Sequence, residues 1–431
     1  MKDTQDVDGV LLLFHHFPGE NAPTIMEHVE SFARHSRFPV FAVNTDRGFP
    51  RALEHLRFRA VVLHYSLFGG DYYFLSRHYR RYLDDSRDGS YAVAFFQDEM
   101  RFCQKRFEFL DRFGIDAVYT LLEPEEHAKV YGTYTNVREM RTTLTGYVSD
   151  ELIDLAKQLT LAADARPIDV GYRARQLPFW MGRGAQEKHE IAERFVERAQ
   201  LLDLRLDIDS GESARIYGGS WFDFVASCRG MLGVEAGTSI FDLDDTARVK
   251  TEALLAHDPE LTFEQVEEQL LSDYEDKVFY RTVSPRHFEA AALRVVQILY
   301  PGRYSGVLEA DVHYLALEKD FSNFDDVMRR FADPAERRQI TDRAYEDLVA
   351  SGRWSYASFV HDFDGHLSAT GVGATLLAGE RRTIDRRLRR GARFGQIVAH
   401  SRWFLRNVQF PGRARVASSY RRLRASSDVR R

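Results

Sequence analysis

Val10-Leu11-Leu12-Leu13-Phe14 is an apolar run with the length of a buried strand, and a helix-like stretch follows it at 24–35. This alternation continues through the first 150 residues. The predicted strands are 10–14, 39–43, 60–64, 91–96 and 117–121, and the predicted helices are 24–35, 51–56, 74–83 and 102–113. Short apolar strands that alternate with helices indicate a parallel, doubly wound sheet.

A second alternating block begins at Ile168-Asp169-Val170-Gly171-Tyr172. Its predicted strands are 168–172, 204–208, 231–234, 296–299 and 314–317, and its predicted helices are 186–200, 222–228, 324–331 and 334–351, with one more that begins near Glu289. The chain is therefore expected to be an α/β protein with two Rossmann-like, doubly wound domains that face a cleft. Ligands of such sheets lie beyond the carboxyl ends of the strands.

The predicted domain boundaries follow from this pattern. The first domain takes residues 1–150, and the second takes 165–350 with a charged helical insertion at about 245–277. A closing helix at 351–369 and a basic, Arg-rich helical tail at 370–431 follow. The length of 431 residues suits two separate cores.

Composition excludes several classes of protein. Hydrophobic residues make up 44% of the chain and charged residues 29%, which indicates a globular chain and not a disordered one. The two cysteines, Cys103 and Cys228, give neither a disulfide framework nor zinc spacing. The polar first residues do not resemble a signal peptide, and residues 10–14 are far too short to span a membrane. A cytoplasmic protein is expected.

The charge is distributed unevenly along the chain. Residues 381–431 hold sixteen Arg and two Asp, a net charge of +14, whereas the whole chain carries −6. Such a tail predicts contact with an anionic surface, and we expect a peripheral position at the inner face of a membrane and no nucleic-acid partner. The tail residues Phe394, Trp403 and Phe404 interleave with Arg, as in a basic surface helix. A solvated extension is the alternative.

The stretch Ser284-Pro285-Arg286-His287-Phe288-Glu289 opens a small-residue helix after a polar turn. A helix start gathers free N–H groups and the positive end of the helix dipole, which suits a phosphate. A carboxylate such as Glu289 can accept hydrogen bonds from two sugar hydroxyls. Ser284, Arg286 and Glu289 are therefore candidate nucleotide-sugar ligands, although an acidic residue in a first helical turn is also common without a ligand.

Two further stretches end predicted strands. Backbone N–H groups near Glu235, Gly237 and Thr238 are candidates for holding a base or phosphates, with a plain turn as the alternative. Asp98 ends the fourth strand and is a candidate for orienting a hydroxyl, with a helix N-cap as the alternative. No metal site is expected, because the adjacent His15 and His16 have no partner at ligand spacing.

With these residues in place, the second half resembles the nucleotide-binding domain of GT-B glycosyltransferases. The similarity is to the retaining family that includes sucrose and glycogen synthases and bacterial mannosyltransferases. Glu289-Ala290-Ala291-Ala292 is similar to the second of the family's two glutamates and its helix, and Tyr304-Ser305-Gly306 to the turn before the next strand. The resemblance covers residues 165–367 by motif and 1–150 by architecture alone.

The resemblance implies roles for several residues. A basic residue within Gly171-Tyr172-Arg173-Ala174-Arg175 and a later Lys, of which Lys188 is the best match, would clamp the diphosphate. Gly19 would lie in the loop that approaches the donor phosphates. Two positions depart from the family pattern. Arg281 stands where the first glutamate is expected, and Gln97 replaces a histidine before Asp98. We regard Asp98, Glu289 and Arg281 as the candidate catalytic residues.

The function implied is transfer of a sugar from a nucleoside-diphosphate sugar to a hydroxyl acceptor, such as a cell-surface glycan, a lipid-linked sugar or a small molecule. The first domain would hold the acceptor and the second the donor, without a bound metal or other cofactor. Two alternatives remain open: a non-catalytic subunit that binds nucleotide-sugar or glycan and docks to a partner, and a nucleotide-sugar epimerase. A dinucleotide oxidoreductase is disfavoured, since no G-x-G-x-x-G follows the first strand.

Overall fold

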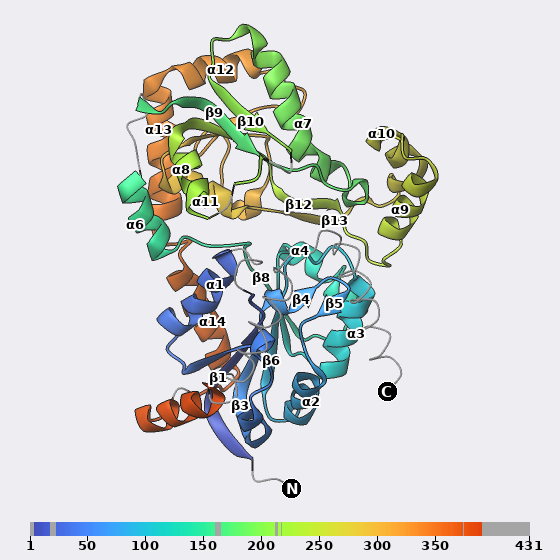
Figure 1. The fold of residues 1–431 in the computed structure, drawn as a ribbon, viewed down its shortest axis with the longest axis vertical. Coiled ribbons are helices and arrows are strands. Elements are labelled where there is room, and N and C mark those ends of the chain that lie inside the picture. The colour runs from blue at the N-terminus through green and yellow to red at the C-terminus, as the bar shows by residue number, and fades with distance from the viewer. Residues whose placement is uncertain are drawn as a thin grey trace, which may run out of the picture.

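Two α/β domains lie one above the other in the computed structural model (Figure 1). The structure describes residues 4–17, 23–159, 165–211, 214–216, 218–373 and 375–389. Each domain is built on its own parallel sheet with helices on both faces. This arrangement confirms the predicted fold class of two Rossmann-like domains.

The N-terminal sheet has six parallel strands in the order β2-β1-β3-β6-β7-β8. The central strands are apolar runs because both of their faces are covered. Val10 and Leu12 of β1 pack on one side with α1, while Leu11 and Leu13 pack on the other with α2 and α3. The strands are β1 (Gln5–Phe14), β2 (Val40–Asn44), β3 (Leu56–Leu63), β6 (Tyr91–Phe95), β7 (Ala117–Thr120) and β8 (Glu139–Thr142). The helices are α1 (Pro23–His35), α2 (Arg77–Ser86), α3 (Cys103–Phe113), α4 (Pro124–His127) and α5 (Tyr131–Tyr134).

The C-terminal sheet has five parallel strands in the order β10-β9-β11-β14-β15. Gly171 of β9 lies against Cys228, whose Sγ would be 2.3 Å from an added Cβ, so this glycine is required for packing. The strands are β9 (Ile168–Arg173), β10 (Leu206–Asp209), β11 (Cys228–Gly233), β14 (Val296–Leu299) and β15 (Leu315–Ala316). The helices are α6 (Asp150–Leu159), α7 (Arg183–Arg198), α8 (Gly219–Ser227), α11 (Pro285–Ala292), α12 (Phe324–Ala332) and α13 (Pro334–Tyr345).

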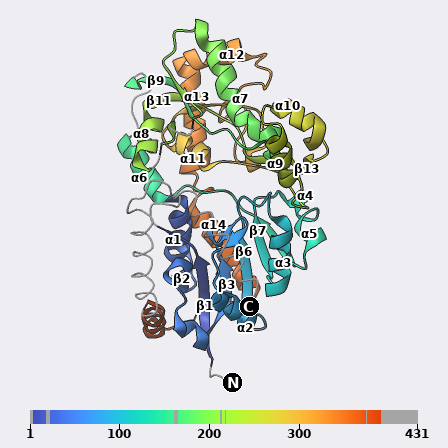
Figure 2. The same ribbon diagram turned by 45° about the vertical axis from the view of Figure 1, so that its right-hand side comes forward.

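An arm from the C-terminal domain rests on the N-terminal domain (Figure 2). It consists of the antiparallel pair β12 (Ala236–Ile240) and β13 (Glu275–Thr282), with α9 (Ala247–His257) and α10 (Phe263–Val266) between them. The carboxylate of Asp245 accepts hydrogen bonds from the backbone N–H groups of Cys103 (2.8 Å) and Gln104 (3.1 Å). Asp245 therefore caps α3 of the other domain, since Phe102 at the start of α3 gives no side-chain cap. The predicted insertion is helical only as far as residue 271, because its last residues form β13.

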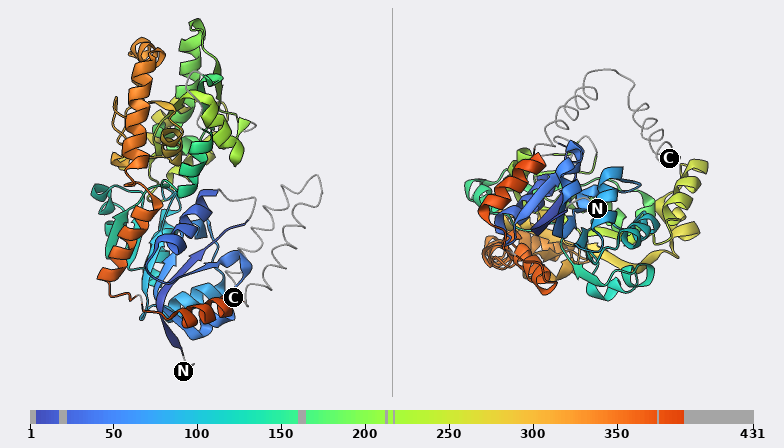
Figure 3. Two further views of the ribbon diagram at one scale, coloured as in Figure 1. Left: turned by 90° about the vertical axis from the view of Figure 1, so that its left-hand side faces the viewer. Right: turned by 90° about the horizontal axis from the view of Figure 1, so that it is seen from below.

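The chain returns to the N-terminal domain after α13 (Figure 3). Helix α14 (Tyr356–Ala369) packs against α1, and Phe359 and Phe363 of α14 contact Phe32 of α1. A helical segment at 378–389 buries Ile384 and Leu388 against the core of the same domain. The part of the predicted tail beyond residue 389 lies outside the described residues.

Candidate functional site

The junction between the domains lies beyond the carboxyl ends of the N-terminal strands. The hydroxyl oxygen of Tyr280 on β13 accepts the backbone N–H of Glu99, which follows β6, at 3.2 Å. Arg303, which follows β14, pairs with Glu123, which follows β7, at 2.6 Å. A cavity of about 90 Å³ between the domains is lined by Glu27 of α1, Glu289 of α11 and residues around them. The predicted cleft therefore exists at the place where ligands of parallel sheets bind.

Three cationic side chains of the C-terminal domain gather at this junction. The ammonium of Lys188 on α7 donates to the carbonyl of Gly237 at 3.2 Å. Burial lowers the pKa of Lys188 to about 8, while nearby Asp98 raises it and Arg286 and Arg175 lower it. These effects place Arg175 and Arg286 within electrostatic reach of Lys188. Such a group of cations is suited to an anion with more than one negative charge.

Helix α11 begins at this group of cations. Ser284 precedes the helix and its hydroxyl oxygen accepts the backbone N–H of Arg286 at 3.4 Å, while Pro285 supplies a first residue with a favourable backbone angle. The guanidinium of Arg286 donates to the carbonyl of Arg173 and lies 4.6 Å above the ring of Trp221. The helix start and Arg286 together offer N–H donors to a phosphate.

Glu289 lies one turn further along α11 and is held by Trp221 of α8. The indole N–H of Trp221 donates to Oε2 of Glu289 at 2.6 Å. Burial raises the pKa of Glu289, whereas the bond from Trp221 and the charge of Arg286 lower it. Trp221 was not predicted from the sequence, because a tryptophan in an apolar helix is indistinguishable there from a core residue.

The N-terminal domain presents carboxylates to the same junction. Asp98 is exposed, and its backbone has a left-handed conformation with φ of 52°. It faces Lys188, and with Glu27 it raises the pKa of Tyr65 beyond the effect of burial. Asp98 does not cap a helix, because α3 begins at Cys103 and receives its cap from Asp245. Gln97 donates to the carbonyl of Thr145 at 3.2 Å.

Several predicted residues have structural partners instead of facing this group. Arg173 pairs with Asp207 of β10 at 2.7 Å and lies 4.4 Å above the ring of Phe224. Glu235 accepts the backbone N–H of Tyr304 at 2.7 Å and so shapes the turn after β14. The hydroxyl of Thr238 donates to the carbonyl of Ile240 and is buried. Gly171 packs inside the sheet, and Gly19 lies outside the described residues.

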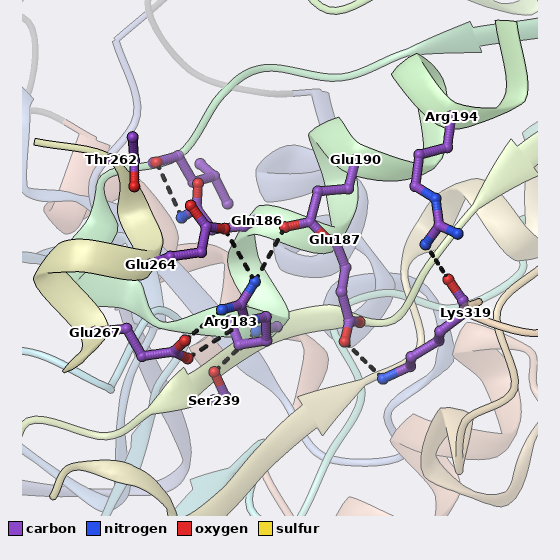
Figure 4. A network of polar contacts seen from close by, with 12 residues as sticks. Arg183, Gln186, Glu187, Glu190, Arg194, Ser239, Thr262, Glu264, Glu267 and Lys319 are labelled. Atoms are coloured by element: carbon purple, nitrogen blue, oxygen red, sulfur yellow. Dashed lines mark hydrogen bonds and ion pairs between the residues drawn. The ribbon is translucent and has the colours of Figure 1, made fainter. Parts of the chain in front are cut away.

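Arg281, one of the candidate catalytic residues, lies between two carboxylates next to α7. Its guanidinium is 3.5 Å from both Glu187 and Asp276, and its side chain is only 14% exposed. Glu187 also pairs with Lys319 at 2.6 Å, a contact drawn in Figure 4. Arg281 is therefore largely neutralised by carboxylates.

In residues 4–389, apart from the undescribed gaps, no group of three or more His, Cys, Asp or Glu side chains is arranged to hold a metal ion. Within the same ranges, no helix has both the length and the apolar character needed to cross a bilayer.

No protein-family model matches the chain, and no curated protein matches it. Solved structures with a similar overall fold include an alpha-glucosyltransferase in complex with UDP and a 13-mer DNA, with 9% identity and a TM-score of 0.49 over 84% of this chain and 99% of that one. Sucrose-phosphate synthase from Thermosynechococcus elongatus has 12% identity and a TM-score of 0.46 over 86% and 100%. Anabaena HepE in complex with UDP and glucose has 12% identity and a TM-score of 0.43 over 84% and 99%.

Proposed function

We propose that this protein is a glycosyltransferase that moves a sugar from a nucleoside-diphosphate sugar to a hydroxyl acceptor. The observation that carries the proposal is the division of charge at the domain junction. Lys188 of the C-terminal domain, with Arg175 and Arg286 near it, faces Asp98 of the N-terminal domain, and Glu27 faces Glu289 across the neighbouring cavity. A diphosphate fits the cationic side, and hydroxyl groups fit the side with the carboxylates.

In this proposal the donor diphosphate lies against Lys188, Arg286 and the first turn of α11. Negative charge builds up on the diphosphate as the glycosidic bond breaks, so cations fixed there lower the barrier. Lys188 is already held by Gly237 and needs little reorganisation to do this. Asp98 would orient the acceptor hydroxyl, and the walls of the cleft would exclude water.

Metal independence is part of the same proposal, since the three cations would neutralise the diphosphate. Adding EDTA to the purified protein should then leave donor turnover unchanged. Turnover that is lost with EDTA and restored by Mg²⁺ or Mn²⁺ would contradict this part of the proposal and leave the transfer itself in place.

A second function is favoured by one specific observation. Arg281 is neutralised by Glu187 and Asp276, and Gln97 is engaged by Thr145, so neither side chain is positioned for chemistry on a sugar. A non-catalytic subunit that binds a nucleotide-sugar and docks to a partner would show this arrangement. It would bind the donor without ever turning it over.

The basic tail belongs to the proposal as well. Sixteen Arg in residues 381–431 would hold the enzyme near an anionic membrane that carries lipid-linked acceptors. Binding of the full chain to vesicles with and without anionic lipid tests this, and equal binding to both would contradict it.

The test of the main proposal is a thermal-shift screen against UDP, GDP, ADP, TDP and CMP with their sugars, followed by donor-turnover assays. A ligand that binds the native state raises the melting temperature. Stabilisation by one nucleotide with release of that nucleotide from its sugar supports the transferase. Stabilisation without release in the presence of crude acceptors supports the binding subunit, and no stabilisation by any of them contradicts both.

A further inference from the structure

The loop that joins β6 to α3 has a strained backbone. Asp98 and Phe102 within it have left-handed conformations, with φ of 52° and 53°, although neither is a glycine. Such conformations persist only where the surrounding structure holds the backbone. Residues 98–104, the Asp98 loop, are therefore expected to have strong contacts with the rest of the molecule.

The N-terminal domain holds the Asp98 loop through the side chain of Glu99, which is fully buried. Oε1 of Glu99 accepts the hydroxyl of Thr120 and the backbone N–H of Leu121, each at 2.7 Å. Oε2 accepts the hydroxyl of Tyr131. These donors offset the cost of burying the carboxylate. Glu99 thus points into its own domain, while the neighbouring Asp98 is exposed at the cleft.

The C-terminal domain holds the same loop through its arm. The hydroxyl oxygen of Tyr280 on β13 accepts the backbone N–H of Glu99 at 3.2 Å. The backbone N–H of Asp242, which follows β12, donates to the carbonyl of Met100 at 2.9 Å. The carboxylate of Asp245 accepts two further N–H groups at the end of the loop, where it caps α3. Three residues of one domain therefore bind the backbone of one loop of the other.

The arm is fixed in this position by apolar packing. Phe241, Val278 and Tyr280 of the arm belong to the same core as Met100 of the Asp98 loop. The rings of Phe241 and Tyr280 meet edge to face, with centroids 5.2 Å apart. Figure 1 shows β12 and β13 above this end of the N-terminal domain. Since Tyr280 is only 2% exposed, its hydroxyl can leave the loop only if the arm itself moves.

We propose that Tyr280 is a positioning residue for Asp98. By holding the backbone of Glu99, it fixes the direction in which the carboxylate of Asp98 meets the acceptor hydroxyl. The proposal rests on the proposed function, which gives Asp98 that role. The acceptor side of the cleft is then complete only while the arm of the C-terminal domain is docked, so transfer is coupled to contact between the domains.

The experiment uses the full chain and the variant Tyr280→Phe, which keeps the ring and removes the hydroxyl. Tyr79→Phe is the matched control, because Tyr79 is fully buried in the same core and its hydroxyl donates to the carbonyl of Gly48 at 2.7 Å. The donors are UDP-glucose, GDP-mannose, ADP-glucose and TDP-glucose, with a nucleotide-free cell extract as the source of acceptors. Release of nucleotide gives kcat and the KM for the donor.

Tyr280→Phe should lower kcat about tenfold and leave the donor KM within about twofold, because only the orientation of Asp98 changes. Tyr79→Phe should change neither value, although it also loses a buried hydrogen bond. The double variant Asp98→Ala/Tyr280→Phe should be no slower than Asp98→Ala alone, since Tyr280 acts through Asp98. If Tyr280 has only a structural role, the two losses multiply instead.

A second readout does not depend on activity. Amide hydrogen exchange, followed by mass spectrometry over residues 97–104, should be faster in Tyr280→Phe than in the unmodified protein, and Tyr79→Phe should leave it unchanged. Unchanged exchange in Tyr280→Phe overturns the inference. An unchanged kcat in Tyr280→Phe, or losses that multiply in the double variant, also overturns it.

Failure of the proposed function gives a different result. The unmodified protein then releases nucleotide from none of the four donors, while exchange in the Asp98 loop still responds to Tyr280→Phe. Asp98 in that case has no acceptor to orient, and the inference falls with the proposed function.

Circular-dichroism melting curves identify variants that do not fold. If Tyr280→Phe fails to fold, Asp245→Ala gives the deciding comparison, because it loosens the other end of the same loop. It should lower kcat about threefold with the donor KM unchanged. An unchanged kcat in Asp245→Ala would then overturn the inference.

Discussion

The two domains share one sheet topology and differ in the charge that they bring to the cleft. In order of appearance, the strands of the C-terminal sheet run 2-1-3-4-5, and the N-terminal sheet has the same order with one strand added at its edge. The C-terminal domain places the cations Lys188, Arg175 and Arg286 at the junction together with Glu289, whereas the N-terminal domain places the carboxylates Asp98 and Glu27 there. Topology thus fixes where the cleft lies, and the side chains decide which charges each domain brings to it.

The largest effect is expected from removing the central cation. Lys188→Ala should lower donor turnover by about 10²–10³-fold, because a fixed charge at the leaving diphosphate is lost. Lys188→Arg is the control, since it keeps the charge and should retain more turnover. Turnover is measured as nucleotide release from the donor found in the thermal-shift screen, and unchanged turnover in Lys188→Ala would show that the cationic side of the comparison is misassigned.

The second prediction concerns the positive charge of Arg281. Arg281→Glu places a carboxylate against buried Glu187, so it should destabilise the protein by about 3 kcal/mol. Arg281→Met keeps the aliphatic volume and should cost less. Chemical denaturation gives both free energies of unfolding. A gain of transfer activity in a well-folded Arg281→Glu protein would instead show that this position limits the reaction.

A pH-dependent difference is expected at Glu27. Its pKa rises from 4.5 to about 7 on folding, so the ionised form is disfavoured in the folded state, and stability is lost as the pH rises through that interval. Glu27→Gln lacks this loss. The free energy of unfolding of Glu27→Gln, taken relative to the unmodified protein, should therefore be about 1–2 kcal/mol higher at pH 8 than at pH 4.5. This value is reduced because Glu27 is partly exposed.

Thermal unfolding at the two pH values checks this, with Glu30→Gln as the exposed control on the same helix. A Glu27→Gln difference that is the same at both pH values would mean that Glu27 is not ionised against neighbouring carboxylates. The N-terminal domain would then not bring the charge of Glu27 to the cleft.

The smallest effect is expected where the arm meets the N-terminal domain. Asp245→Ala removes the cap of α3 and should destabilise the protein by about 1 kcal/mol. Asp245→Asn keeps an acceptor oxygen and should cost less. Denaturant unfolding measures both, and an Asp245→Ala variant as stable as the unmodified protein would show that this contact does not hold the domains together.

The sequence by itself determined the two sheets, because buried parallel strands must be short apolar runs and helices must separate them. It missed β8 and β13, whose residues Glu139-Met140-Arg141-Thr142 and Glu275-Asp276-Lys277 carry charges. An edge strand or an exposed hairpin needs no apolar run, because backbone hydrogen bonds to the neighbouring strand hold it in place. Strand β8 pairs with β7 in this way, and β13 pairs with β12.

The sequence also singled out Arg286, Glu289 and Asp98 as candidates, since each follows a predicted strand or opens a predicted helix, and the family resemblance added Lys188. Tertiary structure alone decided which of them meet. Arg173 is engaged by Asp207, while Trp221 and Glu27, unremarkable in sequence, come to Glu289 from another helix and from the other domain. Contacts of this kind depend on how helices and domains pack, and no local pattern in the chain encodes that packing.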